Sequence, residues 1–344
     1  MGNTLKILKA GNGDSLIIRF LGNDEKYKNI IIDGGNKKSE YEAFLKSEIL
    51  EIRDRNENID LLILTHTDQD HVKGIQYLLN DSSIDNSLIK CIWFNSFEES
   101  NFQDNNDISY LESCKIQGLI KDSNIPRKNN IIINEFEVLK FFGAQISLLS
   151  PLEEDLNKLI DKNSHDISSE ANDYDYTVEE LINKNPEIFK NKNEELDFTI
   201  ENRVSIALLI EVNNKSIFLL GDANPDVVEN SVKKLIKLRG IERLRVDLIK
   251  LSHHASKRSL SLQLMEMIDS NYFIVSTNGK KSNLPNKLTF AKVLNRPYKN
   301  GEKDFFIFNY DEVVDNLKFT NNDFERYNFS CLKPNYKNGY IVDL

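Results

Sequence analysis

The sequence contains few cysteines and no long apolar run, and both absences narrow the classes of protein to which it can belong. Cys91, Cys114 and Cys331 are scattered and odd in number, which favours reduced thiols in a cytoplasm and argues against a cysteine metal site. No apolar run of about 18 residues occurs, so no transmembrane helix is expected. Residues 11–14, Gly-Asn-Gly-Asp, interrupt the first apolar segment before it reaches the length of a signal-peptide core. We therefore expect a cytoplasmic protein that does not contact a membrane.

Other absences exclude familiar catalytic machinery. The sequence has no Gly-x-Ser-x-Gly motif, no Walker-type loop and no dinucleotide-binding fingerprint, so a serine hydrolase has no support. It also shows no internal repeat or heptad array. The apolar content of 40% is nevertheless enough for a sizeable core, in one large or two modest domains.

Histidine is scarce too, but its distribution is informative. Four of the five histidines form two pairs, His66 with His71 and His253 with His254. With Asp68 and Asp70, the first pair places four potential metal ligands within six residues. The alternative interpretations are a solvated polar loop for the first cluster and a surface doublet for the second. Their joint occurrence favours a metal site.

The first cluster follows a short apolar segment and precedes an amphipathic one. Residues 59–65, Ile-Asp-Leu-Leu-Ile-Leu-Thr, are typical of a strand that is buried on both faces. Residues 72–79 are predicted to form a helix, and residues 246–251 form another apolar strand before His253. Irregular backbone between a strand and a helix can direct several side chains to one point.

Five short motifs follow one another along the chain: Gly11-Asn12-Gly13-Asp14, Ile32-Asp33-Gly34-Gly35, His66-Thr67-Asp68-Gln69-Asp70-His71, Leu219-Leu220-Gly221-Asp222 and His253-His254-Ala255-Ser256-Lys257. Alone, the first and fourth are ordinary turn chemistry. In this order they resemble the motifs of the metallo-β-lactamase superfamily of metallo-hydrolases. The His-x-Asp-x-Asp-His form is similar to the hydrolase domain of ComEC-type competence proteins and their stand-alone relatives.

The resemblance covers roughly residues 1–290 and implies an α/β fold, the four-layer αββα sandwich of that superfamily. We expect a hydrolase domain over residues 1–300, with insertions at about 95–130 and 151–201. A short β-rich extension, residues 301–344, is expected to pack on this domain. Its apolar runs at 305–308, 317–319 and 340–342 predict strands at a sheet edge.

The resemblance also implies a site for one or two divalent metal ions. The expected ligands are His66, Asp68, Asp70, His71, Asp222 and His253, with Asn202 (or Glu201) as a weak substitute ligand. Asp68 stands where the family has a second histidine, and residues 199–206 lack the family's histidine before Gly-Asp. A hard carboxylate favours Mn²⁺ or Mg²⁺ without excluding Zn²⁺. We expect the second site, with Asp70 and His71, to bind metal more tightly than the first.

Such a site implies hydrolysis by a metal-bound hydroxide, because a bound divalent metal lowers the pKa of water from about 16 to roughly 7. Asp70 and Asp222 would orient the nucleophile. His254 is assigned as proton donor to the leaving group, although which of His253 and His254 binds metal stays open. Ser256 and Lys257 would suit a developing oxyanion.

Charge bears on the substrate. The chain has 44 basic and 54 acidic residues, a net charge of −10, which argues against a protein that coats nucleic acid generally. Residues 233–299 nevertheless contain 15 basic and four acidic residues, including Lys250, Lys257, Arg258, Lys280 and Lys281. A positive rim beside a metal site favours an anionic substrate such as DNA or RNA, whereas solvated helix faces are the alternative.

Residues 151–201 are the acidic counterpart, with 15 acidic and five basic residues. We predict helices near 152–159 and 178–188. The segment is expected to be a solvated excursion, with a lid over the site or a docking arm for a protein partner as alternatives. The favoured function is a phosphodiesterase or nuclease. The alternatives are a hydrolase of a small phosphorylated or ester substrate, and a metal-stabilised regulatory subunit of a multi-protein system, for example in defence.

Overall fold

The computed structural model describes residues 2–95, 108–133, 138–159 and 172–344. Its strands are β1 (Thr4–Leu8), β2 (Leu16–Leu21), β3 (Tyr27–Ile32), β4 (Leu61–Leu64), β5 (Ile92–Phe94), β6 (Arg127–Lys128), β7 (Val138–Phe141), β8 (Ala144–Ser150), β9 (Ala207–Val212), β10 (Lys215–Leu219), β11 (Leu244–Arg245), β12 (Leu248–Lys250), β13 (Ile268–Asp269), β14 (Tyr272–Val275), β15 (Asp304–Phe308), β16 (Phe329–Leu332) and β17 (Gly339–Asp343). Its α-helices are α1 (Lys38–Glu40), α2 (Lys46–Asp54), α3 (Gln69–Leu79), α4 (Ile108–Asp122), α5 (Glu153–Leu159), α6 (Val178–Lys184), α7 (Pro186–Phe189), α8 (Ile200–Arg203), α9 (Pro225–Arg239), α10 (Leu262–Met267), α11 (Lys287–Leu294), α12 (Asp311–Asn316) and α13 (Asn321–Tyr327). A π-helical turn η1 (Tyr41–Leu45) and 3-10 turns η2 (Asn86–Leu88) and η3 (Ser252–Ala255) complete the elements.

Most of the strands belong to two mixed sheets. The first sheet has seven strands in the order β17-β1-β2-β3-β4-β5-β6, and the second has eight in the order β16-β15-β14-β12-β10-β9-β8-β7. Within each sheet, antiparallel neighbours on one side give way to parallel neighbours on the other. Parallel neighbours need crossover connections, usually helices, which accounts for the helices that cover the sheets.

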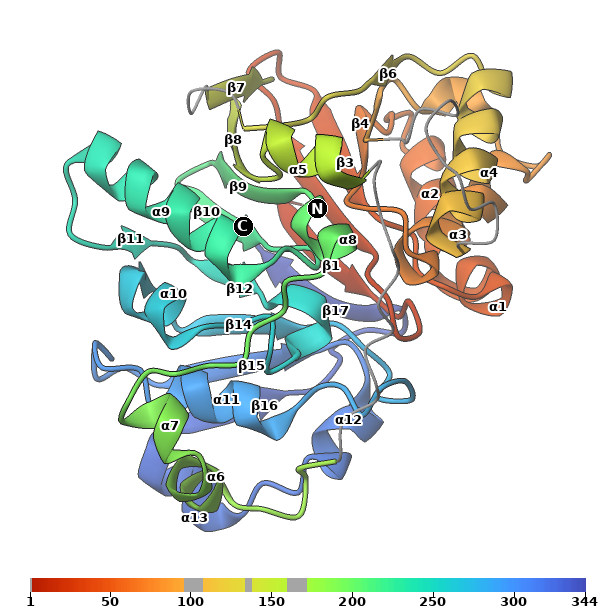
Figure 1. Cartoon of the computed structure of the whole chain (residues 1–344). Coiled ribbons are helices and arrows are strands. Elements are labelled where there is room, and N and C mark those ends of the chain that lie inside the picture. Colours follow the sequence, from red (N-terminus) through yellow and green to blue (C-terminus); the bar gives the residue numbers. More distant parts are fainter. Residues whose placement is uncertain (1, 96–107, 134–137, 160–171) are drawn as a thin grey trace.

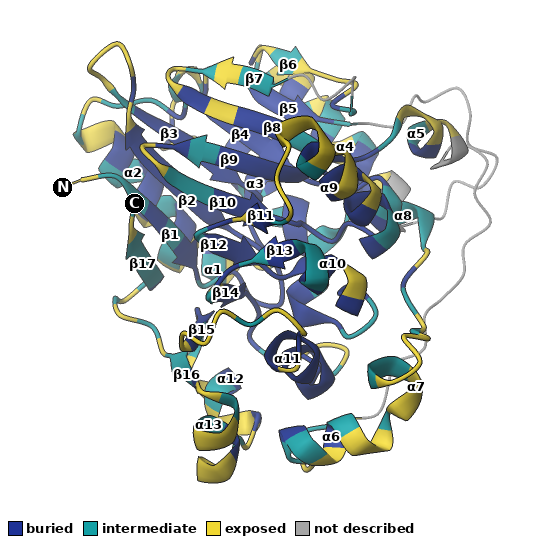
Figure 2. Cartoon of the chain, turned by 90° about the vertical axis from the view of Figure 1, so that its left-hand side faces the viewer, coloured by how far each residue is buried: buried dark blue, intermediate teal, exposed yellow. Residues whose placement is uncertain are grey.

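Three separate apolar cores establish the layering. One lies between the two sheets, one between the first sheet and α2, α3 and α4, and one between the second sheet and α9, α10 and α11. Figure 1 shows these two groups of helices on opposite sides of the strands, and Figure 2 shows the strands mainly buried. The predicted four-layer αββα sandwich is confirmed.

Strand β4 shows why the segment before the first ligand cluster is apolar throughout. Leu61 and Ile63 face the core between the sheets, whereas Leu62 and Leu64 face the core under α3. Side chains alternate between the two faces of a strand, so a strand covered on both faces is apolar at nearly every position.

The C-terminal segment extends both sheets. The strands predicted at 305–308 and 340–342 are confirmed as β15 and β17, which pair with β14 and β1. The strand predicted at 317–319 is wrong. Helix α12 ends just before it, Lys318 has a φ of 49°, and Leu317 reaches the core of the second sheet from this turn. Its apolar composition therefore reflects burial without a strand.

The acidic insertion is partly described, since residues 160–171, like residues 96–107 of the first insertion, lie outside the described residues. The predicted helices correspond to α5 and to α6 with α7. Residues 172–201 do not form the solvated excursion that the sequence analysis expected. Asp173 accepts hydrogen bonds of 2.8 Å from the backbone N–H groups of Lys287 and Leu288 at the start of α11. Glu194 likewise accepts from Leu262 N at the start of α10. These carboxylates satisfy otherwise unpaired helix-terminal donors.

Among the described residues, no helix is both long and apolar enough to cross a membrane.

Candidate metal centre

The predicted ligands lie near the ends of strands from both sheets, in loops and in short helical turns. His66 and Asp68 follow β4 in the first sheet, and Asp70 and His71 lie in the first turn of α3. Asp222 follows β10 and the pair His253 and His254 follows the neighbouring β12 in the second sheet, whereas Asn202 lies in α8 before β9. Loops at one edge of a rigid sandwich can bring side chains together that are far apart in sequence.

Asp222 is the point on which the histidines converge. Its Oδ2 lies 3.4 Å from His71 Nε2, 3.7 Å from His66 Nε2, and 3.9 Å from the Nε2 atoms of both His253 and His254. Four imidazoles thus surround one carboxylate oxygen.

Two further carboxylates border this cluster on different sides. Asp70 Oδ2 lies 3.6 Å from His254 Nε2, and Asp68 Oδ2 lies 3.8 Å from His66 Nε2. Among the described residues, three groups of potential ligand atoms share His71: one with His66 and Asp222, one with Asp70 and His254, and one with Asp14 and Asp33.

Three imidazole nitrogens in this cluster are buried without a hydrogen-bond partner among the described residues: Nε2 of His66, of His71 and of His254. Leaving a buried polar atom unpaired costs free energy, and such atoms usually have a reason. Neutral imidazole nitrogens beside carboxylates are the donor set of a divalent metal. The residues therefore fit a metal ion, which would satisfy all three nitrogens.

Asp33 orients His71. Its Oδ2 accepts a hydrogen bond of 2.7 Å from His71 Nδ1, and its carboxylate also accepts from Thr65 N at 2.8 Å and Thr65 Oγ1 at 2.7 Å. Because Asp33 fixes a proton on Nδ1, the Nε2 atom of His71 that faces Asp222 is the nitrogen that a metal ion would bind. Carboxylate–histidine pairs of this kind fix the ring and raise its basicity as a ligand.

His66 and Asp222 are held by hydroxyl groups. His66 Nδ1 lies 3.0 Å from Thr65 Oγ1 and 3.4 Å from Ser205 Oγ. Ser205 Oγ also accepts from Asp222 N at 3.0 Å. Ser205, which lies just before β9, therefore contacts both His66 and Asp222.

The Gly11–Asp14 loop holds Asp70 from the other side. Asn12 Nδ2 donates to Asp70 Oδ2 at 2.6 Å. Gly13 packs so closely that a Cβ atom there would lie 1.6 Å from the backbone oxygen of Asp70, so only glycine fits.

Lys250 lies beneath the centre and not on a basic rim, which corrects the sequence-based expectation. Its side chain and that of Asp14 are each 1% exposed and form an ion pair. Lys250 Nζ also donates to Gly221 O at 3.0 Å and lies 3.8 Å from Asp222 Oδ1. Lys250 lies two residues after Leu248 on β12 and therefore shares its face, toward the space between the sheets.

The electrostatics of the cluster favour positive charge. Burial opposes ionisation, but Asp222 and Asp33 raise the pKa of His71 well above its usual value, and Asp222, Asp14 and Asp70 raise the pKa of His254 to about 9. Despite burial, the surrounding histidines hold the pKa values of Asp70 and Asp222 far below the usual range. Protons and a divalent metal would compete for the same atoms.

The mouth of the centre is formed by more exposed side chains. Asp68 and His253 have side chains that are 39% and 29% exposed. Lys281, 61% exposed, places Nζ 3.6 Å from Asp70 Oδ2. Asn202 lies behind His253, where its Nδ2 donates to Asp197 Oδ2 and lies 3.3 Å from His253 Nδ1.

Lys257 makes two hydrogen bonds through its backbone. Its N donates to Asn286 Oδ1 at 2.9 Å and its carbonyl accepts from Lys292 Nζ at 2.6 Å. Burial raises the pKa of Asp173, and the Lys257 ammonium acts in the opposite direction. At the mouth, Lys281 contacts the cluster directly through Asp70.

Sequence reasoning did not include the supporting residues Asn12, Asp14, Asp33, Asp197 and Ser205 among the site residues. A signal existed for the first three, because Gly-Asn-Gly-Asp and Asp-Gly-Gly were recognised as motifs. For Asp197 and Ser205 the sequence offers only polar residues near the place of the missing histidine.

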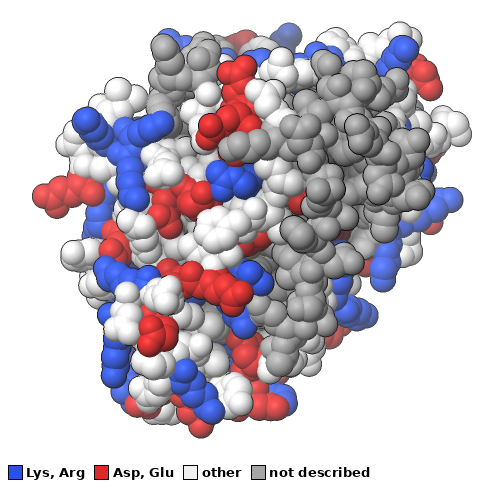
Figure 3. All heavy atoms as spheres, viewed as in Figure 1, with Lys and Arg blue, Asp and Glu red and all other residues white. Residues whose placement is uncertain are grey.

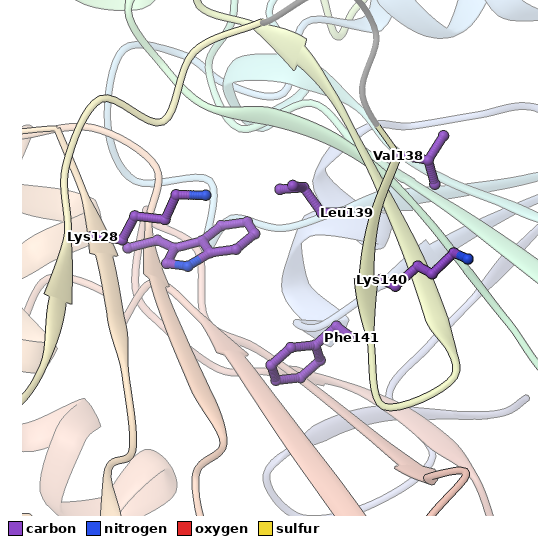
Figure 4. A pocket seen from close by; sticks show the side chains of 6 residues that line it. Lys128, Val138, Leu139, Lys140 and Phe141 are labelled. Carbon is purple, nitrogen blue, oxygen red and sulfur yellow. The ribbon is translucent and has the colours of Figure 1, made fainter.

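A separate cavity of about 550 Å³ lies away from these residues. It is lined by Trp93 and Lys128 of the first sheet and by Val138, Leu139, Lys140 and Phe141 of the edge strand β7 (Figure 4). None of the predicted site residues contributes to its lining.

Comparison with known proteins agrees with this fold. The model of the metallo-beta-lactamase superfamily matches residues 9–104, which include the Gly11–Asp14 loop, Asp33 and the first ligand cluster. No curated protein matches the sequence.

Several solved structures resemble the chain at low identity. The metallo-beta-lactamase fold protein YhfI from Bacillus subtilis matches over 99% of this chain and 100% of its own, with 11% identity and a TM-score of 0.42. Zn²⁺-bound PqqB from Methylobacterium extorquens matches over 97% and 88%, with 11% identity and a TM-score of 0.40. CmlA, a diiron beta-hydroxylase from Streptomyces venezuelae, matches over 100% and 54%, with 11% identity and a TM-score of 0.43. The chain spans about half the length of CmlA.

The layered sheets and the matched motifs define the chain as a protein with the metallo-β-lactamase fold. Its histidines and aspartates at the edge of that sandwich form a candidate centre for divalent metal.

Proposed function

We propose that the chain is a divalent-metal-dependent hydrolase of phosphodiesters. The observation that supports this most directly is the set of three buried Nε2 atoms without partners that face Asp222 Oδ2. A buried arrangement of this kind is costly to maintain unless a ligand completes it.

We assign the ligands as two groups that share Asp222. His66 and Asp68 belong to the first metal position; Asp70, His71 and His254 belong to the second. A bound divalent metal would supply a hydroxide at neutral pH and positive charge for a developing oxyanion. Because Asp68 offers a hard oxygen, Mn²⁺ or Mg²⁺ suits the first position, whereas the imidazole-rich second position suits Zn²⁺ or Mn²⁺.

The chain's own residues prepare the site. Asn12 holds Asp70, Asp33 holds His71, and Ser205 holds Asp222, so each carboxylate or ring is fixed before a substrate arrives. Catalysis benefits when such groups need no reorganisation during the reaction.

An anionic substrate fits the mouth. Lys281 is exposed, adjoins Asp70, and would face a substrate phosphate once a metal compensates the Asp70 charge. On the face shown in Figure 3, basic and acidic side chains of the described residues are interspersed, without a continuous basic stripe. A phosphodiester that contacts the protein only near the mouth, such as an end or loop of DNA or RNA, therefore fits better than a long nucleic acid bound along the surface.

The His66-x-Asp68-x-Asp70-His71 form supports a place in the ComEC-type branch of the superfamily, whose stand-alone members resemble this chain. The three cysteines are free, which supports a cytoplasmic location.

The test is a cleavage assay with metal-stripped protein. Single- and double-stranded DNA and RNA and a chromogenic phosphodiester are incubated with Mn²⁺, Zn²⁺ or Mg²⁺. We expect metal-dependent cleavage that the double variant Asp70→Ala, His71→Ala lacks and that the variant Asp122→Ala, changed at an exposed position at the end of α4, retains. Cleavage retained by the double variant, or none by native protein shown to contain metal, contradicts the proposal.

A further inference from the structure

His253 and His254 are neighbours in sequence and both direct Nε2 toward Asp222, but their Nδ1 atoms face opposite kinds of partner. His254 Nδ1 lies 2.9 Å from the carbonyl oxygen of Ser276. A carbonyl oxygen only accepts hydrogen bonds, so Nδ1 holds a proton, and Nε2, 3.6 Å from Asp70 Oδ2, is the nitrogen left for a metal. This is the tautomer that a metal ligand needs.

His253 meets a donor in the same place. Its Nδ1 lies 3.3 Å from Asn202 Nδ2, and an amide nitrogen only donates. Ser259 Oγ, 3.4 Å from Nδ1, can donate as well, whereas the carboxylate oxygen Asp197 Oδ2 is 3.9 Å away, beyond hydrogen-bond distance. Nδ1 therefore accepts and Nε2 holds the hydrogen, 3.9 Å from Asp222 Oδ2. In this tautomer His253 donates a hydrogen bond from Nε2 and has no lone pair there for a metal.

The orientation of the Asn202 amide is fixed by Asp197. The same Nδ2 donates to Asp197 Oδ2, and a carboxylate only accepts, so exchanging the oxygen and nitrogen of the amide would break this bond. Asp197 is 2% exposed, and its other oxygen accepts from Thr199 N at 2.9 Å. Its backbone N–H donates to Arg258 O at 2.9 Å.

The backbone separates the two rings. His253, His254 and Ala255 have φ values of 45°, 53° and 65°, all in the left-handed region that residues with a Cβ atom adopt at a cost. The ring planes of the two histidines are 77° apart. This strained turn lets adjacent residues present their rings to different partners.

We propose that Asp197 and Asn202 are positioning residues that hold His253 as an N–H donor to the substrate, while His254 is the metal ligand of the pair. The donor addresses an oxygen of the substrate phosphate beside Asp222, and its 29% exposed side chain is accessible from the mouth. Asp197 comes from the acidic insertion, so this insertion contributes to the site itself. The substrate class in this inference rests on the proposed function.

The tautomers are measured directly by NMR with ¹⁵N-labelled histidine, in the metal-free and Zn²⁺-loaded protein. We expect His253 to hold its proton on Nε2 in both forms, and His254 to bind Zn²⁺ through Nε2. The variant Asn202→Asp has a side chain of similar shape, but its carboxylate accepts hydrogen bonds. It is expected to move the His253 proton to Nδ1 and to raise the amount of metal that the protein binds at limiting metal concentration. We expect kcat to fall about 10- to 100-fold, as with other outer partners of a metal site.

Two further variants separate this role from folding. Asp197→Asn is expected to release the Asn202 amide, so that His253 shows a mixture of tautomers with Zn²⁺ content unchanged. Glu195→Gln changes an 83% exposed carboxylate two residues away and is expected to leave the tautomer as in native protein. Circular dichroism confirms that each variant is folded.

The outcomes separate the two proposals. A native His253 with its proton on Nδ1, or a folded Asn202→Asp variant with an unchanged tautomer, overturns the positioning role. Native protein with the expected tautomer that binds metal and cleaves no phosphodiester supports the positioning role and removes the proposed substrate class.

Discussion

The buried half of the candidate metal centre differs from its open half in how each side chain is held. In the buried half, Asp70, His71 and His254 are at most 7% exposed, and each has a hydrogen-bond partner behind it. In the open half, Asp68 and His253 have side chains that are 39% and 29% exposed. Asp68, the N-terminal cap of α3, makes no capping hydrogen bond with its side chain.

This difference suggests that the buried half of the centre determines metal affinity and that the open half determines substrate access. Groups that are already fixed lose little conformational freedom on binding, so the buried half is expected to bind metal tightly. Exposed groups are screened by water and must be ordered, so the open half is expected to exchange metal and admit substrate.

The largest effect is expected from His71→Ala in the buried half. The ring lies 3.4 Å from Asp222 and is 0% exposed, and its removal leaves Asp33 without its imidazole partner. We expect turnover to fall by more than the roughly 100-fold that losing an outer partner costs. Metal content by mass spectrometry should fall with it. Full metal content in a folded variant would show that the halves do not differ as described.

Asp33→Asn tests the support behind the buried half. An amide keeps the size of the carboxylate but removes its charge, so His71 is oriented less firmly. We expect metal affinity to fall about 10- to 100-fold, measured by titration calorimetry.

Asp60→Asn is the matched control for Asp33→Asn. Asp60 lies at the opposite end of β4 and accepts from Asn29 N at 3.0 Å, so this variant loses a partly buried carboxylate far from the centre. Equal losses of metal affinity in both variants would point to a general effect on stability.

A smaller effect is expected from Asp68→Ala in the open half. The variant removes one exposed ligand of the first position and leaves the buried half intact. We expect activity to fall several-fold at limiting metal and to recover in excess metal, because mass action compensates a weaker site. A loss that excess Mn²⁺ does not restore would place Asp68 in the tightly held part of the centre.

Particular residues show how far the sequence alone reaches. The apolar run of residues 59–65 predicted the buried strand found at 61–64, and the spacing from His66 to His71 indicated candidate ligands after it, because both depend on local sequence patterns. The sequence analysis assigned His253 as a ligand and His254 as the proton donor while leaving the choice open. The reverse assignment that we propose depends on Asn202 and Ser276, which reach the two rings only in the folded chain.

The sequence analysis overestimated the basic surface near the centre, because some of the lysines that it counted are buried. Lys250 was expected on a basic rim, yet it pairs with Asp14 under the centre, and Lys292, also 1% exposed, pairs with Glu194. Counting charges along the sequence cannot show which ones are neutralised inside the fold.

The smallest effect is expected from Lys281→Ala at the mouth. Lys281 contacts Asp70 Oδ2 at 3.6 Å but is 61% exposed, so it contributes to substrate attraction more than to the structure of the centre. We expect KM for an oligonucleotide to rise with kcat unchanged, and the salt dependence of binding to weaken by about one unit of slope. Lys257→Ala is expected to change KM less, because the Lys257 ammonium acts on Asp173 in the insertion. A fall in kcat for Lys281→Ala, with metal content unchanged, would instead place this lysine at the reacting phosphate and make the open half part of the catalytic machinery.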